Sequence, residues 1–226
     1  MKEIIVKEES KFTKEGGYVV YVENGKEYKE DLISAELLNP KLNFKFLNPV
    51  QTVFYKFYEN KSALVATPTS SGKTICALHF IQKHIGLKVY TVPTKSLANE
   101  IYNFFKKIFI NVDLRTGDVI EEAYEIRSDL VVCTYESLLL SIRNGGWGYN
   151  ASAIVIDEIH FIFSNRGSAI EEIVAFLKMK NKADILGLSA TLPMYMEIAR
   201  WIEAKLVIKS NFRPVKLIIN TQQIKL

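Results

Sequence analysis

A Gly-Lys-Thr triplet ends a loop at residues 67–74 and has the residue types that bind a phosphate. The loop follows an apolar run and precedes a helical pattern, and in such a unit backbone N–H groups point at an anion. Lys73 would bring a positive charge to the β- and γ-phosphates of a nucleotide, and Thr74 would offer its hydroxyl to Mg²⁺. Thr67 stands where the usual pattern has glycine, so an ordinary turn with a solvated lysine stays open.

Two adjacent carboxylates, Asp157 and Glu158, end a second apolar run at 153–156. Asp157 would hold Mg²⁺, directly or through water, and Glu158 would orient and deprotonate an attacking water. Taken alone, the pair also fits a solvated strand end. Because ligands bind at the carboxyl ends of parallel strands, we expect the acidic pair and the loop to meet at one edge of one sheet.

The elements that must position these side chains alternate from residue 47 onward. Short apolar, β-branched runs predict strands, and stretches with helical periodicity follow them. This alternation predicts an α/β fold, a doubly wound and mostly parallel sheet of the P-loop type. Strands are expected at 63–66, 88–92, 129–133, 153–156, 184–188 and 206–208, and helices at 73–86, 95–109, 168–178, 194–203 and from about 136.

Residues 1–46 have a different pattern and are expected to form a small N-terminal appendage, with the main domain at 47–226. The run at 18–22 is rich in β-branched and aromatic residues, and the Asn24-Gly25 pair after it favours a tight hairpin turn. Residues 27–30 would return as the partner strand. A lid packed on the main domain and a surface for a specific partner both stay open for this β-hairpin.

The composition is that of an ordinary globular chain of 226 residues, with 48% hydrophobic residues and a net charge of +4. The mild positive charge permits a polyanionic partner without requiring one. Cys76 and Cys133 form neither a metal-type pair nor a disulfide framework, which predicts a reducing, cytoplasmic setting. No apolar run approaches the ~18 residues of a membrane span, and the charged N-terminal stretch is unlike a signal peptide.

With both motifs in place, the chain resembles the first motor domain of superfamily 2 DExH-box helicases from about residue 46 to residue 214. The family often has a non-glycine residue where Thr67 stands. The segments 116–118, 157–160, 166–167 and 212–215 look nearest the branch that holds the archaeal fork-remodelling DNA repair helicases and the RNA-exosome helicases. The motifs occur in the family's order, with the glutamine motif at 47–51, motif I at 67–74, Ia at 92–98, Ib at 115–118, a further nucleic-acid motif at 133–138, II at 157–160 and III at 187–193.

The resemblance implies a RecA-like domain that uses ATP and Mg²⁺ and moves along single-stranded nucleic acid. It gives catalytic roles to Lys73, Asp157, Glu158 and His160, and it makes Thr74 and Asp157 the Mg²⁺ ligands. It assigns nucleotide binding to Gln51, which reads adenine, and to Thr69, Ser70, Ser71, Gly72, Lys73 and Thr74. Ser189 and Thr191 would couple ATP to nucleic acid, which would be contacted by Pro93, Thr94, Lys95, Thr116, Gly117, Asp118, Thr134 and Tyr135.

Plainer structural roles stay open for several of these positions. Gln51 also suits the start of a helix, Thr94 suits a helix cap, and the segment 116–118 suits a turn. His79 and Trp201 are expected to be structural, at helical positions. For these residues the resemblance implies a functional role in addition to a possible role in capping a helix or forming a turn.

Family members need an arginine finger from a second RecA-like motor domain, and residues 194–226 lack the Gln…Gly-Arg…Arg pattern that would carry it. Such a finger is worth roughly 10³–10⁵ in rate. We therefore expect this chain to bind ATP, to hydrolyse it slowly and to be unable to unwind a duplex alone. Its partner would be a single strand held by its phosphates, with DNA favoured over RNA. A stand-alone ATP- and nucleic-acid-binding module is the alternative.

Overall fold

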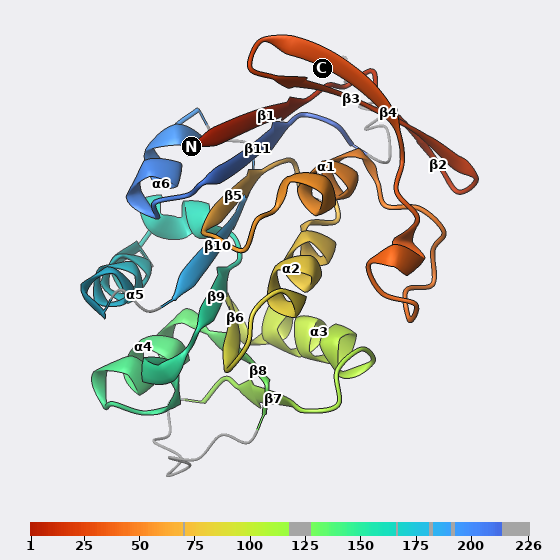
Figure 1. Ribbon diagram of the computed structural model, residues 1–226. Helices are drawn as coiled ribbons and strands as arrows, with labels where there is room; N and C mark the ends of the chain where they lie inside the picture. Colours follow the sequence, from red (N-terminus) through yellow and green to blue (C-terminus); the bar gives the residue numbers. More distant parts are fainter. Residues whose placement is uncertain (70, 118–127, 166, 181–182, 191–192, 214–226) are drawn as a thin grey trace, which may run out of the picture.

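The computed structural model describes residues 1–69, 71–117, 128–165, 167–180, 183–190 and 193–213. Within these residues, eleven strands form one sheet, and helices cover both of its faces (Figure 1). The predicted α/β fold with a mostly parallel sheet is therefore confirmed. None of the helices in these ranges is long and apolar enough to cross a membrane.

The centre of the sheet is parallel and consists mainly of short, fully buried strands. Their side chains are mostly aliphatic, as is typical of parallel strands that are covered on both faces. The predicted strands all form, within two residues of their expected ends. In order across the sheet they are β11 (Leu206–Ser210), β5 (Ala63–Ala66), β10 (Asp184–Ser189), β9 (Ala153–Ile156), β6 (Lys88–Val92), β8 (Leu130–Thr134) and the unpredicted β7 (Val112–Arg115).

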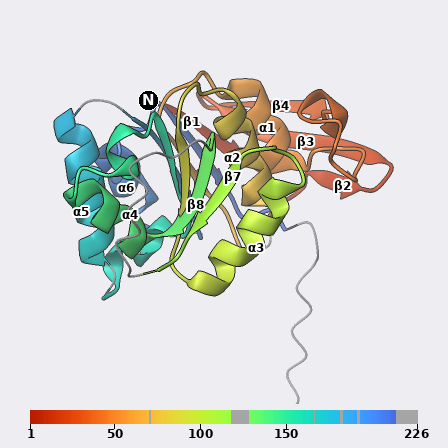
Figure 2. The same ribbon diagram turned by 90° about the horizontal axis from the view of Figure 1, so that it is seen from below.

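Helices cover both faces of the sheet (Figure 2). The buried side chains form a separate hydrophobic core on each face. One face carries α1 (Pro49–Phe57), α2 (Lys73–Gln82) and α3 (Lys95–Lys106). The other carries α4 (Tyr135–Arg143), α5 (Gly167–Lys180) and α6 (Tyr195–Trp201). Short 3₁₀ segments lie between these elements, namely η1 (Ala35–Leu37), η2 (Trp147–Asn150) and η3 (Ile159–Phe163).

Two helices end three or four residues earlier than the sequence predicts. α2 stops at Gln82 rather than 86, and Gly86 has a φ of 88°, a left-handed conformation that a helix interior does not allow. α3 stops at Lys106 rather than 109. α6 ends two residues early, at Trp201 rather than 203, whereas α5 ends two residues late, at Lys180 rather than 178. The helical periodicity therefore predicts that these helices form but not where each one ends.

The predicted hairpin forms from β3 (Gly16–Glu23) and β4 (Lys26–Asp31). β1 (Lys2–Val6) pairs antiparallel with β3 and parallel with β11, and β2 (Lys11–Thr13) extends the antiparallel part. The hairpin thereby continues the sheet of the main domain (Figure 1). The sequence pattern does not predict β1, whose apolar residues follow two charged ones. The domain division at residue 46 stays a prediction.

The hairpin also packs on helix α1 of the main domain. Tyr21 of β3 lies edge-on against Phe57 of α1, with ring centroids 5.5 Å apart. Lys56 of α1 forms an ion pair with Glu30 of β4 at 2.5 Å. Through these two contacts the hairpin covers part of the main domain at α1.

Candidate functional site

The phosphate-type loop connects the carboxyl end of β5 to the first residue of α2, as the sequence predicts. Gly72 has a φ of 76° just before the helix, a conformation that favours glycine. Lys73 is buried, and its Nζ donates to the carbonyl oxygens of Thr67 and Pro68, each at 3.2 Å. Burial lowers the pKa of Lys73, and the nearby carboxylates of the acidic pair oppose that shift. The lysine charge therefore lies inside the loop, close to the acidic pair.

The other loop residues have different surroundings. Ser71 is buried, and its hydroxyl lies 2.6 Å from that of Thr67, so the threonine in place of the usual glycine has a local partner. Thr69 is exposed and Thr74 is half-buried. Ser70 lies outside the described residues.

Side chains at the start of α1 hold the backbone of this loop. Asn48 and Gln51 form a reciprocal capping box, with hydrogen bonds of 3.0 and 2.9 Å. Asn48 Nδ2 also donates to the carbonyl of Ser71 at 2.8 Å, and Gln51 Nε2 donates to that of Gly72 at 2.9 Å. A Cβ atom on Gly72 would lie 2.4 Å from Gln51 Nε2. Gln51 thus touches the loop directly, whereas its contact with adenine stays a prediction.

Asp157 and Glu158 form a turn after β9 that is held by two buried tyrosines. The hydroxyl of Tyr90 in β6 donates to Asp157 Oδ2 at 2.8 Å, and the hydroxyl of Tyr135 donates to the carbonyl oxygen of Asp157. Glu158 has a φ of 53°, a left-handed conformation that costs a non-glycine residue about 1–3 kcal/mol. Such local strain is typical of functional sites.

Burial raises the pKa of Asp157 to about 6, although the Tyr90 hydrogen bond and the Lys73 ammonium act in the opposite direction. The Thr74 side chain also contacts the Tyr90 hydroxyl, so the Thr74 hydroxyl and the Asp157 carboxylate both contact the same phenol group. Mg²⁺ binds nucleotides through one or two such oxygen ligands, with water and phosphate completing its shell. Within the described residues no cluster of three or more His, Cys, Asp or Glu offers an all-protein metal cage. The donor set therefore fits the predicted Mg²⁺ site.

His160 joins the acidic turn to the segment after β10. Its Nδ1 accepts a 3.3 Å hydrogen bond from the backbone N–H of Ala190 and lies 3.2 Å from Glu158 Oε2. Burial and the charge of Lys73 lower the pKa of His160, which favours a neutral ring whose Nδ1 can accept. The hydroxyl of Ser189 is buried without a hydrogen-bond partner among the described residues. Thr191, the second predicted coupling residue, lies outside those residues.

The predicted nucleic-acid residues follow β6, β7 and β8, which are neighbours in the sheet. After β6, Pro93 is buried, while Thr94 and Lys95 are exposed where α3 begins. Thr94 caps that helix by accepting from the backbone N–H of Leu97 at 3.2 Å. The capping role and an exposed edge thus occur together at this strand end.

The segments after β7 and β8 contact each other. Thr134 caps α4 by accepting from the backbone N–H of Ser137 at 3.3 Å, and Ser137 Oγ donates to the carbonyl of Gly117 at 3.3 Å. Thr116 is half-buried and Gly117 is exposed, whereas Asp118 lies outside the described residues. The structure thus brings these segments together at the carboxyl edge that also carries the acidic turn.

Tyr135 differs from the expectation that it contacts nucleic acid. Its side chain is 0% exposed, and its hydroxyl is directed at the acidic turn. The ring belongs to the core between α4, α5 and the sheet, because the first residue of α4 turns inward from the strand end. In this structure the side chain of Tyr135 does not reach the surface.

Sequence reasoning missed the contacts of Tyr90 and Tyr135 with the acidic turn. Each tyrosine lies in or directly after a fully buried strand, and a buried phenol hydroxyl usually finds a hydrogen-bond partner. That rule signals that a partner exists, although it cannot identify Asp157. Asn48 was likewise missed, although an asparagine before a proline is an ordinary capping signal.

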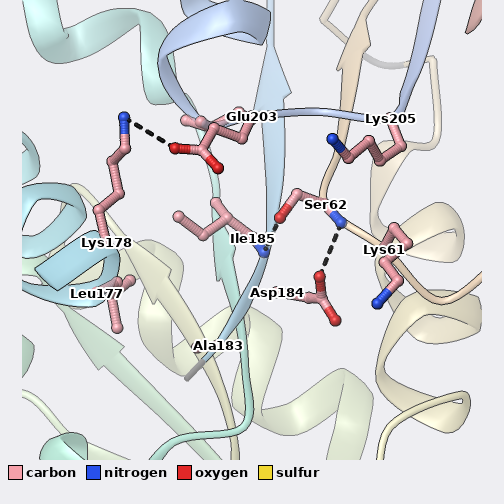
Figure 3. A pocket seen from close by; sticks show the side chains of 10 residues that line it. Lys61, Ser62, Leu177, Lys178, Ala183, Asp184, Ile185, Glu203 and Lys205 are labelled. Atoms are coloured by element: carbon pink, nitrogen blue, oxygen red, sulfur yellow. Dashed lines mark hydrogen bonds and ion pairs between the residues drawn. The ribbon is translucent and has the colours of Figure 1, made fainter. Parts of the chain in front are cut away.

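A pocket of about 350 Å³ lies at the opposite, amino-terminal edge of the sheet (Figure 3). Ser62 precedes β5, Asp184 begins β10 and Lys205 precedes β11. Asp184 Oδ1 accepts from the backbone N–H of Ser62 at 3.0 Å, and Lys178 pairs with Glu203 at 3.2 Å. The Ser62 N–H and the Asp184 carboxylate thus satisfy each other, as do Lys178 and Glu203. The predicted catalytic residues lie at the other edge.

Comparison with known proteins shows which proteins this chain is similar to. A family model described as DEAD/DEAH box helicase matches residues 48–198. The ATP-dependent DNA helicase Hel308 of Pyrococcus horikoshii is 40% identical over 169 residues, which cover 70% of this chain and 23% of that protein. Hel308 of Caldivirga maquilingensis is 39% identical over 168 residues, covering 70% of this chain and 22% of that protein. The chain thus spans less than a quarter of these curated relatives.

The fold is also found in a solved structure, the helicase domain of Hef from Pyrococcus furiosus. The TM-score is 0.60 at 23% sequence identity, and the match covers 79% of this chain and 39% of that chain. At this identity the likeness concerns the fold, and it agrees with the RecA-like arrangement of the parallel strands.

Proposed function

Because the chain belongs to the DEAD/DEAH box helicase family, we propose that residues 47–226 are the ATP-binding first motor domain of an ATP-dependent DNA helicase. One observation carries the proposal. Lys73 follows β5 and Asp157 follows β9, yet both are buried at the same sheet edge, close enough for each charge to act on the pKa of the other. A basic group for phosphate and an acidic pair at one sheet edge are the parts that phosphoryl transfer requires.

In this proposal the loop residues 69–74 bind the phosphates of ATP through backbone N–H groups. Lys73 exchanges its two carbonyl contacts for the β- and γ-phosphates. Mg²⁺, when bound, neutralises phosphate charge, and Thr74 and Asp157 would hold it. Glu158 orients the attacking water and accepts its proton. Gln51 reads the adenine ring while its amide also contacts the loop.

The nucleic-acid side of the proposal uses the segments after β6, β7 and β8. Thr94, Lys95, Thr116, Gly117 and Thr134 would contact phosphates of a single strand. Helix N-termini and hydroxyls suit such backbone contacts, which carry no base sequence. DNA is favoured over RNA because the Hel308 relatives are named as DNA helicases. Because the contacts are made to phosphates, the affinity for nucleic acid should fall as the salt concentration rises.

Coupling between the two sides would pass through His160 and Ser189. His160 already contacts both Glu158 and the backbone N–H of Ala190. The hydroxyl of Ser189, which has no hydrogen-bond partner in the part of the chain that the structure describes, would respond when ATP changes the turn. Thr191 would share this role.

We propose further that hydrolysis and unwinding require a second RecA-like domain, which supplies the arginine finger. The Hel308 relative of Pyrococcus horikoshii is more than four times as long as the matched region, which leaves room in that protein for such a domain. A stand-alone module that binds ATP and nucleic acid without translocation is the second candidate. A single-turnover hydrolysis rate above ~1 s⁻¹ for this chain alone would contradict the need for a second domain.

Binding of MgATP, measured by isothermal titration calorimetry, tests the proposed function. Lys73→Ala should weaken binding by about tenfold or more, because hydrogen bonds to charged groups contribute roughly 1.5–3 kcal/mol. Lys83→Ala removes an exposed lysine at the other end of α2 and should leave binding unchanged. Equal affinity of wild type and Lys73→Ala would contradict the nucleotide site.

A further inference from the structure

Tyr135 connects two parts of the proposed motor that lie far apart in the sequence. It is the first residue of α4, directly after Thr134, which caps that helix at the predicted nucleic-acid edge. Its hydroxyl donates to the carbonyl oxygen of Asp157 and lies 3.5 Å from that of Glu158. One side chain therefore joins the first turn of α4 to the backbone of the acidic turn.

This contact passes over the end of a whole strand. β8 leads into Tyr135 and β9 leads into the acidic turn, and both pair with β6, which lies between them. Neighbouring strands lie about 4.8 Å apart, so the two strand ends are separated by roughly 10 Å. A tyrosine bridges such a gap with a rigid ring and only two main side-chain torsions.

The tyrosine ring cannot move independently of its surroundings. It is fully buried and belongs to the same apolar cluster as Leu138 of α4 and Ile159 after the acidic turn. Close-packed side chains transmit displacement because no free volume absorbs it. Glu158 already has a φ of 53°, so a small change in the backbone of the turn redirects its carboxylate.

Resting on the proposed function, we propose that Tyr135 is a positioning residue that couples single-stranded nucleic acid at the start of α4 to the Asp157–Glu158 turn. Phosphates held beside Thr134 fix the first turn of α4. The Tyr135 hydroxyl carries that position to the carbonyl oxygens of the acidic turn. By thermodynamic linkage, ATP at the turn changes the affinity for nucleic acid by the same factor.

The Tyr135→Phe variant tests this coupling, because it keeps the ring and removes only the hydroxyl. The affinity of the 226-residue chain for MgATP is measured with and without a saturating single-stranded DNA oligonucleotide. DNA should change the wild-type affinity about fivefold or more, the lower end of usual allosteric couplings. In Tyr135→Phe, DNA should change the MgATP affinity by less than about twofold.

Tyr58→Phe is the matched control, since it removes another buried phenol hydroxyl. Within the described residues the Tyr58 hydroxyl has no hydrogen-bond partner, and it lies near Asp184 at the amino-terminal edge of the sheet. This variant should keep the wild-type factor. Hydrogen exchange of the backbone amides at 157–159 gives a second readout. DNA should change that exchange in wild type and in Tyr58→Phe, and not in Tyr135→Phe.

The outcomes separate a coupling role from a structural one. A Tyr135→Phe chain that melts at a lower temperature but keeps the wild-type factor overturns the proposal. A wild-type chain that binds both ligands without changing either affinity also overturns it, while leaving the proposed function intact. A wild-type chain that binds neither ATP nor DNA refutes the proposed function, and the coupling with it.

Discussion

The phenol of Tyr90 donates a 2.8 Å hydrogen bond to Oδ2 of Asp157, and both groups are buried. Tyr90 pairs with Val155 in the neighbouring strand β9, so its side chain reaches forward to the first residue after that strand. The other carboxylate oxygen of Asp157 accepts from the backbone N–H of Glu158 at 2.9 Å. Both oxygens of the predicted Mg²⁺ ligand are therefore oriented by the protein itself.

Tyr90→Phe should raise the Mg²⁺ concentration needed for half-maximal ATP binding by about tenfold, as is usual when a partner of a metal ligand is removed. The ring stays and the core remains packed, so the change isolates the hydrogen bond. Titration of Mg²⁺ against a fluorescent ATP analogue measures the effect, with Tyr58→Phe as control. An unchanged Mg²⁺ midpoint would show that Asp157 keeps its orientation without Tyr90.

Glu158→Gln should abolish ATP turnover while keeping ATP affinity within about twofold, because the amide cannot accept the proton of the attacking water. Single-turnover hydrolysis and calorimetric binding on the same preparation separate the two effects. The comparison is most sensitive with the second motor domain present, which raises the wild-type rate. Turnover that survives in the variant would remove Glu158 from the role of base.

Gly72→Ala should weaken ATP binding by on the order of tenfold and lower the free energy of unfolding by about 1–3 kcal/mol. The new methyl group meets Gln51 Nε2 at 2.4 Å and requires alanine at a φ of 76°. Gly25→Ala is the matched control, since Gly25 has the same φ and no heavy atom of the described residues lies within 4 Å of its Cβ position. Calorimetry and urea unfolding measure both quantities. Equal losses of ATP affinity in both variants would show that Gln51 does not hold the loop.

His79 should make the stability of the chain depend on pH. It lies in α2 against the rings of Phe54, Tyr55 and Tyr58, and burial lowers its pKa from 6.5 to about 4. The His79 ring stays neutral in the native state, whereas in the unfolded state it takes up a proton as the pH falls below 6.5. The stabilisation that comes from this neutral ring is therefore complete above about pH 6.5 and is lost as the pH falls towards 4. At about 1.4 kcal/mol per pKa unit, the loss reaches about 3 kcal/mol.

His79→Phe should remove that part of the pH dependence. The free energy of unfolding in urea, measured at pH 7 and at pH 4.5, should fall less in the variant than in wild type. Other groups titrate equally in both chains, so the difference belongs to His79. Parallel losses in the two chains would show that His79 is not neutral in the native state.

Local patterns in the sequence predict most of the fold and the main chemical groups. The loop at 67–74 could be identified because its strand, glycine and lysine are neighbours in the chain, and the loop geometry depends on that spacing. Asp157 and Glu158 could be identified because carboxylates rarely end a buried strand without a reason. The hairpin at 18–30 followed from Asn24 and Gly25, which both adopt a positive φ. The exact helix ends and β1 did not follow, since tertiary packing decides them.

The sequence by itself determined most of the strands and helices along the chain, the phosphate-type loop and the acidic pair, because each depends on contacts between residues close in the sequence. Only the tertiary structure decided that β6 lies between β8 and β9. That order brings Tyr90 and Tyr135 to the same acidic turn. Strand order depends on packing between distant segments, and no local spacing encodes which buried hydroxyl meets which carboxylate.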